Sequence, residues 1–415
     1  MQGGKLSFME KDLKDKTIEE LEQIVVSLGQ KKYLAGYIFS FIHTKNVDEI
    51  SQITPLSKIL RSQLVEQGYF ISQLKIISKL TDPDGTIKYL FELSDGNRIE
   101  TVLLFDEGPL TRTFEGRRKT LCISTQVGCA MNCSFCATGK IKLQRNLTAA
   151  EIVDQVNIVE TSNGCDTRFI ERRTLNAADT SRATDRRNTR SINVVYMGMG
   201  EPLLNYDAVV RSIRILNHPA GKNIGIRHIT VSTCGIVPAI KKLADEEIRP
   251  RLAISLNAPT DALRNKLMPI NTKYPIKDVL AAANYYQRKA KQRVSFEYVL
   301  IKGVNDTVLH ARMLAKLLRP IRCRAIPPNG CRINLIEFNP HKSFDVAQDS
   351  EPVEPLCGFE ASGRERIRKF ADVLKDAGIK TTIRFKKGWS INAACGQLGA
   401  DWDVRAKDEG QRAKL

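Results

Sequence analysis

Three cysteines stand close together in the chain, and their spacing allows one metal centre to use all of them. Cys129, Cys133 and Cys136 lie on a loop that follows a predicted strand over residues 120–124. Structural zinc usually takes four protein ligands, and ferredoxin-type clusters use a fourth cysteine at a defined spacing. The local set here stops at three. A four-iron cluster held by three thiolates keeps one iron without a protein ligand, so that iron is open to a substrate.

The C-x3-C-x2-C spacing, with Phe135 before the last cysteine, resembles the signature of the radical S-adenosylmethionine superfamily. In that superfamily the open iron binds the amino and carboxylate groups of S-adenosylmethionine, and an electron from the cluster releases a 5'-deoxyadenosyl radical. The resemblance implies one 4Fe-4S cluster on Cys129, Cys133 and Cys136. The cofactor carries such chemistry, whereas the protein positions and shields it. A non-catalytic, zinc-bound RNA-binding protein is the alternative of a different class.

A glycine-rich turn, residues 197–202, follows a second predicted strand over residues 192–196. Its glycines allow the backbone to approach a ligand, and Glu201 can accept a hydrogen bond from an ammonium group. The turn lacks the third glycine and the helix start of a dinucleotide-binding fingerprint. We therefore interpret it as a contact for S-adenosylmethionine rather than as a Rossmann motif.

The elements that must position these residues alternate between strand and helix. Strands are predicted over residues 120–124, 192–196, 228–232, 251–256, 294–301 and 333–338, with helices such as 206–216, 238–245 and 307–318 between them. Repeated strand-helix units predict a parallel sheet, and about six units favour a partial barrel over a closed eight-stranded one. We expect an α/β fold with a partial (β/α)6 barrel of the radical S-adenosylmethionine type over residues 111–400.

Two smaller regions precede the barrel. Thr17 and Glu20 have capping-box spacing, and apolar residues then recur at helical period, which predicts a helical accessory domain over residues 1–72 that is a candidate for RNA binding. Extended runs at 74–79, 86–93 and 98–105, separated by Asp-Gly turns, predict a short β-meander within residues 73–110 that leads into the core.

Polar segments interrupt the barrel pattern. Residues 165–190 are rich in Arg, Thr, Asp and Asn, and residues 343–363 are polar and contain two prolines. Both are interpreted as surface insertions, and residues 401–415 as a polar tail. The arginine-rich insertion can contact RNA, although a solvated loop is the favoured interpretation.

The composition narrows the class of partner. Lys and Arg number 64 against 46 Asp and Glu, a formal charge of +18, which makes nucleic acid the first candidate partner and leaves solubility alone as the alternative. Ten cysteines in a reducing compartment do not indicate a disulfide framework. We find no signal peptide or membrane-spanning run, and we expect a cytoplasmic monomer that has no membrane partner.

Five stretches together allow a closer match. They closely resemble the RlmN/Cfr family of RNA adenine methyltransferases, and the likeness spans nearly the whole chain: residues 121–129 (LCISTQVGC), 198–205 (GMGEPLLN), 231–233 (VST), 338–340 (FNP) and 393–398 (AACGQL). The helical N-terminal segment also resembles that family's accessory domain.

The resemblance implies a mechanism that uses two further cysteines and a carboxylate. Cys395 takes a methyl group from one S-adenosylmethionine, and the radical made from a second molecule removes hydrogen from that S-methyl group, so two molecules are used per turnover. The carbon radical adds to adenine. Cys122 then attacks the Cys395 sulfur, and the resulting disulfide releases the methylated base. Glu100 matches the family's proton acceptor.

The resemblance also implies a cofactor site and a substrate. The residues carried over for S-adenosylmethionine are Gly200, Glu201, Ser232, Ser255, Leu256, Asn257 and Asn339, and Asn257 departs from the common family pattern, which has His there. The implied substrates are 23S ribosomal RNA and tRNA, and the implied reductant is an electron donor such as flavodoxin. Methylation at carbon 2 of adenine is the favoured reaction, and a Cfr-like carbon-8 methylation is the alternative.

Overall fold

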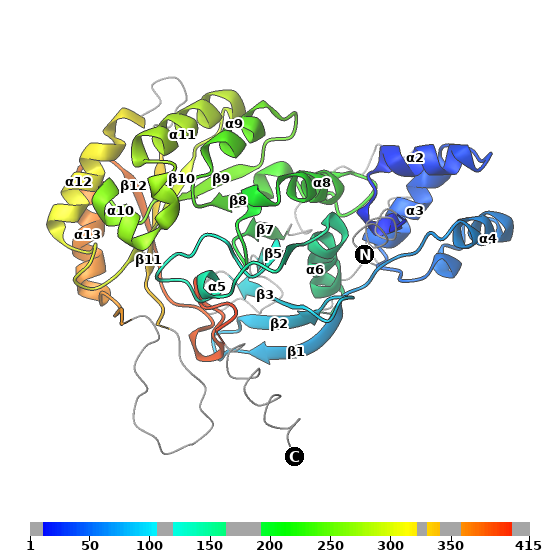
Figure 1. Cartoon of the computed structure of the whole chain (residues 1–415), viewed down its shortest axis with the longest axis horizontal. Coiled ribbons are helices and arrows are strands. Elements are labelled where there is room, and N and C mark those ends of the chain that lie inside the picture. The colour runs from blue at the N-terminus through cyan, green and yellow to red at the C-terminus, as the bar shows by residue number, and fades with distance from the viewer. Residues whose placement is uncertain (1–10, 106–118, 163–191, 322–329, 341–357, 401–415) are drawn as a thin grey trace, which may run out of the picture.

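One open, ten-stranded sheet forms the centre of the computed structural model, which describes residues 11–105, 119–162, 192–321, 330–340 and 358–400 (Figure 1). The strands lie in chain order across it: β1 (Lys75–Thr81), β2 (Ile87–Glu92), β3 (Arg98–Phe105), β4 (Lys119–Cys122), β7 (Asn193–Tyr196), β8 (Ile229–Thr233), β9 (Arg251–Ser255), β10 (Ser295–Leu300), β11 (Arg332–Glu337) and β12 (Lys380–Arg384). A separate hairpin pairs β5 (Gln126–Val127) with β6 (Arg145–Asn146).

Helices follow most strands and lie along the outer side of the curved sheet (Figure 1). Outward-facing strand residues such as Ile254, Phe296 and Leu335 are fully buried beneath them. The α-helices are α2 (Ile18–Ser27), α3 (Leu34–His43), α4 (Lys58–Glu66), α5 (Ala137–Lys140), α6 (Ala149–Ser162), α8 (Tyr206–Asn217), α9 (Val237–Asp245), α10 (Asp261–Leu267), α11 (Ile276–Ala290), α12 (Val308–Leu318) and α13 (Arg364–Asp376). Short 3-10 helices are η1 (Leu13–Asp15), η2 (Ile50–Gln52), η4 (Pro202–Leu204), η5 (Ile226–His228), η6 (Pro269–Thr272), η7 (Arg319–Ile321) and η8 (Trp389–Ile391).

The predicted partial barrel is confirmed. Strands β4, β7, β8, β9, β10 and β11 run parallel to one another, whereas β1 to β4 pair antiparallel as a meander that joins the barrel edge. The sheet has two ends, at β1 and β12, so the barrel stays open. Parallel β12 continues the sheet beyond the predicted strands, and its residues alternate between exposed and half-buried because it lies at the edge.

Strand register brings polar side chains onto the inner face of the sheet. Across the sheet, Cys122 on β4 pairs with Val195 on β7, and Val195 pairs with Thr230 on β8. Thr230 pairs with Arg251 on β9, and Ser255 lies four residues after Arg251 on that strand. Ser255 pairs with Glu297, and Glu297 with Asn334 on β11. Arg384 on β12 pairs with Ile336, two residues beyond Asn334. Because register partners and every second residue share a face, Cys122, Ser255, Glu297 and Arg384 all point inward.

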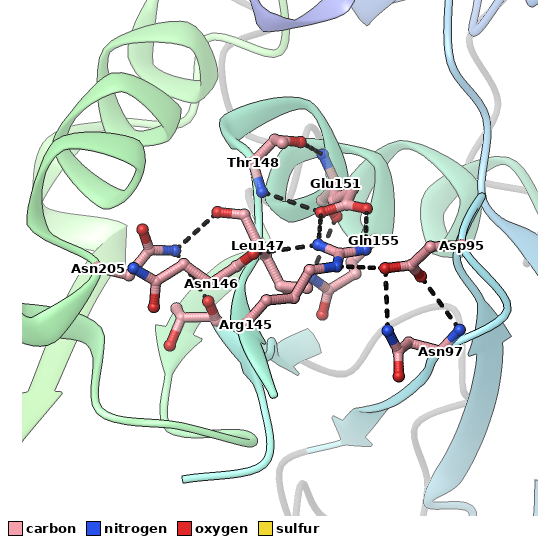
Figure 2. A network of polar contacts seen from close by, with 10 residues as sticks. Asp95, Asn97, Arg145, Asn146, Leu147, Thr148, Glu151, Gln155 and Asn205 are labelled. Atoms are coloured by element: carbon pink, nitrogen blue, oxygen red, sulfur yellow. Dashed lines mark hydrogen bonds and ion pairs between the residues drawn. The ribbon is translucent and has the colours of Figure 1, made fainter. Parts of the chain in front are cut away.

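The loop that carries the three cysteines is fastened where it returns to the sheet. Arg145, on β6, bonds Asp95 at 2.6 Å in the meander and Glu151 at 2.8 Å in the first turn of α6 (Figure 2). Asn205 donates hydrogen bonds to the carbonyls of Thr125 and Leu147 and so joins the loop after β7 to the same region. These contacts hold both ends of the cysteine loop against α6 and the sheet.

The N-terminal helices lie beside α6 and α8, at the opposite side of the molecule from α12 and α13 (Figure 1). The predicted capping box is present: Thr17 accepts the Glu20 N–H, and Glu20 accepts the Thr17 N–H. The ammonium of Lys14 reaches Asp154 on α6 at 2.6 Å, and both side chains are buried. Helix α8 adds an ion pair between Arg211 and Glu20.

Most of the predicted insertions and the tail lie outside the described residues. The insertion at 165–190 and the tail at 401–415 are not described, and of residues 343–363 only 358–363 are. In that short part, Ala361 forms an antiparallel bridge with Ile301, and Gly363 precedes α13. No described helix combines the length and apolar character needed to span a membrane.

Candidate active site

A cavity of about 130 Å³ opens at the carboxyl ends of the parallel strands. The carboxyl ends of such strands are where ligands gather in barrels and open α/β sheets. Nine of the sequence-predicted site residues line it: Cys129, Cys133, Cys136, Gly200, Glu201, Ser232, Ser255, Asn257 and Cys395. Glu100, Cys122, Leu256 and Asn339 are not among its lining residues. Segments that are far apart in the chain therefore meet at one site.

The three motif cysteines are half-buried or buried, and their thiols disfavour one another's charge. Burial raises the pKa of Cys129 to about 12, and the charges of Cys136 and Cys133 add to that rise. Burial and Cys133 likewise raise the pKa of Cys136 to about 11. A bound cation would favour the thiolate forms of Cys129 and Cys136, because it would act against the effect of burial.

A fourth cysteine lies beside the motif, although no sequence motif marks it. The sulfur of Cys234, just after β8, is 3.9 Å from that of Cys133, and Cys234 lines the same cavity. Its pKa is raised well above the ordinary value by Cys133 and by burial. The isolated position of Cys234 in the sequence carries no signal of this, because the contact depends on the packing of β8 against the cysteine loop.

The glycine-rich turn lies directly under the cysteine loop. A Cβ at Gly198 would stand 2.7 Å from the Ile123 carbonyl group, and one at Gly200 would stand 2.5 Å from the Gln126 side chain. Gly200 also has a φ of +97°, which side chains disfavour. Glycine at both positions lets the turn pack against the strand that leads to the cysteines.

Glu201 is held firmly at the cavity wall. Its Oε1 accepts the N–H of Leu203 at 3.1 Å, and its Oε2 accepts the N–H of Cys234 at 2.7 Å. Burial raises the pKa of Glu201, and these hydrogen bonds act against that rise. A buried carboxylate oriented in this way can still accept a hydrogen bond from an ammonium group, because each oxygen has a second lone pair.

The loop that carries Cys395 is attached to α5 and to the segment that follows β11. The Gly396 carbonyl accepts the N–H of Ala137, the first residue of α5, at 2.8 Å, and the Leu398 carbonyl accepts the Thr138 hydroxyl at 2.7 Å. Asn339 donates to the Cys395 carbonyl at 3.3 Å. Gln397 donates to the Pro340 carbonyl at 2.8 Å. Figure 1 shows this C-terminal loop, in red, beside α5. The Cys395 side chain thereby faces the cavity.

Cys122 and Cys395 are near enough for the charge of Cys395 to act on the Cys122 thiol. Burial raises the pKa of Cys122, and the charge of Cys395 raises it further. Cys122 is 8% exposed at the end of β4, whereas Cys395 is exposed to the cavity. Both thiols are free. Burial also raises the pKa of Cys395, and the charge of Arg384 acts against that rise.

Glu100 shares the inner face of the sheet with Cys122, since it is two residues from Val102, the register partner of Cys122. The carboxylate is 3% exposed and 3.3 Å from the Lys88 ammonium. It also accepts the N–H of Gly399 at 2.8 Å. Glu100 therefore contacts the loop of the Cys395 motif without being among the residues that line the cavity.

The strand ends after β8 and β9 complete the wall. Ser232 and Ser255 line the cavity, whereas Leu256 is fully buried. Asn257 adopts the left-handed region at φ +57°, and its amide bonds the Val299 N–H and the Met268 sulfur. Most of its hydrogen-bonding capacity is thus used by the protein. The left-handed backbone conformation costs Asn less free energy than it costs most other residues.

A buried arginine, which the sequence analysis missed, ties these strand ends together. Arg264 on α10 is fully buried and donates to the carbonyls of Cys234 at 2.6 Å and Ser255 at 3.0 Å. Burial lowers its pKa, and the neighbouring thiols act against that fall. Among the described residues, its guanidinium donates to backbone carbonyls and to the Asn271 amide oxygen but to no carboxylate, so it is a fixed cation near the cysteines.

Comparisons with known proteins agree with this geometry. Residues 123–314 match the Radical SAM superfamily model, and residues 11–69 match the "Ribosomal RNA large subunit methyltransferase N-terminal domain". A Thermoanaerobacter protein (strain X514) named "Probable dual-specificity RNA methyltransferase RlmN" is 41% identical over 389 residues, which cover 93% of this chain and 97% of the relative. The chain belongs to the RlmN family of radical S-adenosylmethionine methyltransferases.

Further matches support the family assignment. A Dictyoglomus thermophilum protein with the same name is 42% identical and covers 92% of this chain and 95% of its own length. The crystal structure of a radical SAM methyltransferase from Sphaerobacter thermophilus is 39% identical, has a TM-score of 0.74, and covers 94% of this chain and 99% of its own. The family resemblance stated from the motifs is therefore confirmed.

The residues present fit the cofactors of an RlmN-family protein. Among the described residues, no three His, Cys, Asp or Glu side chains lie close enough to hold a single metal ion. A four-iron cluster takes one thiolate at each of three irons, so its ligands need not be in mutual contact. Cys129, Cys133 and Cys136 would hold that cluster. The adjoining wall, with Glu201, Ser232 and Ser255, would hold S-adenosylmethionine.

Proposed function

We propose that this protein methylates carbon 2 of adenine in 23S ribosomal RNA and in tRNA, with Cys395 as the methyl carrier. The proposal is supported by one observation: Cys395 and the three motif cysteines line the same cavity. The charge of Cys395 also raises the pKa of Cys122. A methyl carrier must reach the cofactor that loads it, and the second cysteine must reach the carrier.

The cluster and S-adenosylmethionine, when bound, supply the transferable methyl group and a 5'-deoxyadenosyl radical, with two molecules of S-adenosylmethionine used per turnover. The chain's own residues have distinct roles. Cys395 takes the methyl group on its sulfur and later links the protein to the base through the transferred carbon. Glu100 removes the proton from the methylated base carbon as the adduct gives up its unpaired electron, for which the cluster, when bound, would be the acceptor. Cys122 attacks the Cys395 sulfur, and the disulfide releases the product and is reduced before the next cycle.

The substrate assignment rests on the relatives and on charge. The relatives' names describe dual-specificity RNA methyltransferases, and residues 11–69 match a model named for ribosomal RNA methylation. A formal charge of +18 favours RNA phosphates as partners. The target adenine must leave its stack to enter a cavity at the strand ends. We place this monomeric enzyme in the cytoplasm, with an electron donor such as flavodoxin.

One experiment tests the proposal. The protein is reconstituted with iron and sulfide without oxygen, then given S-adenosylmethionine, a strong reductant, and either ribosomal RNA or tRNA. We expect 5'-deoxyadenosine and 2-methyladenosine, both identified by mass spectrometry, and no methylated nucleoside from the Cys395→Ala variant. Formation of 8-methyladenosine would assign the Cfr-like reaction instead. Bound zinc without iron or labile sulfide, and no 5'-deoxyadenosine, would contradict an enzymatic function.

A further inference from the structure

One buried carboxylate oxygen in the cavity has no hydrogen-bond partner among the described residues. Glu297, on β10, is 3% exposed and lines the cavity. Its Oε1 accepts the side-chain N–H of Asn334 at 2.7 Å, whereas its Oε2 is buried without a partner. Buried polar atoms are almost always satisfied, so such an oxygen marks a place where a ligand or a proton is received.

Charged groups around Glu297 connect it with Cys395. Burial raises the pKa of Glu297, and Arg384 on β12, Asn334 and Arg332 on β11 act against that rise. The charge of Glu297 in turn raises the pKa of Cys395, whereas Arg384 lowers it. The register of β10, β11 and β12 places Glu297, Asn334 and Arg384 on the same inner face. Glu297 and Cys395 therefore line the same cavity, and the charge of Glu297 acts on the Cys395 thiol.

The proposed methyl loading of Cys395 requires a proton acceptor. A thiolate is the nucleophile in such displacements, and burial favours the protonated form of this thiol. Among the described cavity-lining residues, the carboxylates are Glu201 and Glu297. Both oxygens of Glu201 accept backbone N–H groups, and Glu100 lies outside the lining. Of these two carboxylates, only Glu297 offers an oxygen that has no hydrogen-bond partner in the part of the chain that the structure describes.

We propose that Glu297 is the general base for methyl loading, an inference that rests on the proposed function. The S–H bond of Cys395 breaks, and its proton moves to Glu297 Oε2, directly or through one water molecule. The sulfur then bonds to the methyl carbon as the bond from that carbon to the sulfonium sulfur breaks. The products are S-methylcysteine, a neutral carboxylic acid and S-adenosylhomocysteine. One negative and one positive charge are cancelled, and no electron is transferred.

Methyl loading can be measured apart from the radical steps. Cluster-loaded protein whose Cys395 carries no methyl group, as verified by peptide mass, is mixed with S-adenosylmethionine without reductant or RNA. The mass of the Cys395 peptide is followed with time at several pH values. The test variant is Glu297→Gln, which keeps the shape of the side chain. The matched control is Glu337→Gln on β11, whose carboxylate is 3.6 Å from the Lys386 ammonium and does not line the cavity.

We expect Glu297→Gln to slow Cys395 methylation by about 10²-fold near neutral pH, the usual effect of losing a general base. Its rate should then climb with pH as the thiol ionises without help, whereas the wild-type rate levels off once Glu297 is ionised. Glu297→Asp should recover part of the rate, and Glu337→Gln should behave as wild type. Cluster absorption and S-adenosylmethionine binding should be unchanged, which separates a proton-transfer role from a structural one.

The outcomes separate this inference from the proposed function. Wild-type rate and pH profile in Glu297→Gln would overturn the assignment of Glu297 while leaving Cys395 as carrier. Loss of S-adenosylmethionine binding in that variant would instead make Glu297 a binding residue and also reject the assignment. If wild-type protein binds S-adenosylmethionine yet never acquires a methyl group on Cys395, the proposed function itself is wrong. The assignment of Glu297 as general base is then wrong as well, because it depends on that function.

Discussion

The ammonium of Lys88 lies 3.3 Å from Oε1 of Glu100, and neither side chain is more than 4% exposed. Glu100 Oε2 accepts the N–H of Gly399 at 2.8 Å, four residues after Cys395. One carboxylate thus connects the meander strands β2 and β3 with the loop of the proposed methyl carrier. A role for Glu100 in catalysis must therefore be separated experimentally from its role in holding that loop.

Glu100→Gln makes this separation. A glutamine carbonyl can still accept the Gly399 N–H, so the Cys395 loop should stay in place, but the side chain can no longer remove a proton. We expect Cys395 to acquire its methyl group while RNA product falls by at least about 10²-fold. Peptide mass reports the first step, and nucleoside analysis reports the second. Equal loss of both steps would indicate that Glu100 only holds the loop.

Cys122→Ala should trap the protein on its RNA. Without the second sulfur, no disulfide can form with Cys395, so the link between Cys395 and the methylated base persists. Denaturing gels should show an RNA-protein species that resists reducing agents, because the link is a thioether. Cys331→Ala, at another buried cysteine outside the cavity lining, is the control and should release product normally. Clean turnover by Cys122→Ala would remove it from the mechanism.

The adjacent sulfurs of Cys133 and Cys234 permit a direct test of the ligand set. The motif predicts that Cys133 binds iron and Cys234 does not, although the two sulfurs are 3.9 Å apart. Cys133→Ala should therefore lose iron and labile sulfide after anaerobic reconstitution, whereas Cys234→Ala should keep both. Iron, sulfide and zinc analyses of the two variants provide the measurement. Equal iron loss from both would show that Cys234 is also a ligand.

The sequence predicted well those parts of the molecule whose signal is local. Alternating strand and helix periods indicated the partial barrel, and Thr17 with Glu20 indicated a capping box that is present. Edge strand β12 was not predicted, because its residues, KTTIR, lack the apolar alternation of a half-buried strand. Short motifs and the family resemblance also indicated nine of the residues that line the cavity.

Residues that depend on strand register could not be found in this way. Glu297, Cys234 and Arg264 reach the site only because β8, β9 and β10 pair in one register and α10 packs beneath them. No short motif marks them, and each looks like an ordinary strand, loop or helix residue in the sequence. The cavity lining also excludes Leu256, because its side chain packs into the core instead.

We predict that the buried ion pair between Lys14 and Asp154 stabilises the attachment of the N-terminal helices to the barrel. Lys14→Met leaves a buried carboxylate without its cation, and we expect a loss of about 3–5 kcal/mol in the free energy of unfolding. Among the described residues, Asp154 would keep the Leu74 N–H, at 2.7 Å, as its one hydrogen-bond donor. Urea unfolding of the cluster-loaded protein under anaerobic conditions measures this free energy of unfolding.

The double variant Lys14→Met/Asp154→Leu should recover much of the loss, since it removes both charges. Lys302→Met breaks an exposed ion pair with Glu360 and should change stability little. Similar small effects at Lys14 and Lys302 would show that the Lys14–Asp154 pair does not hold the N-terminal helices on the barrel.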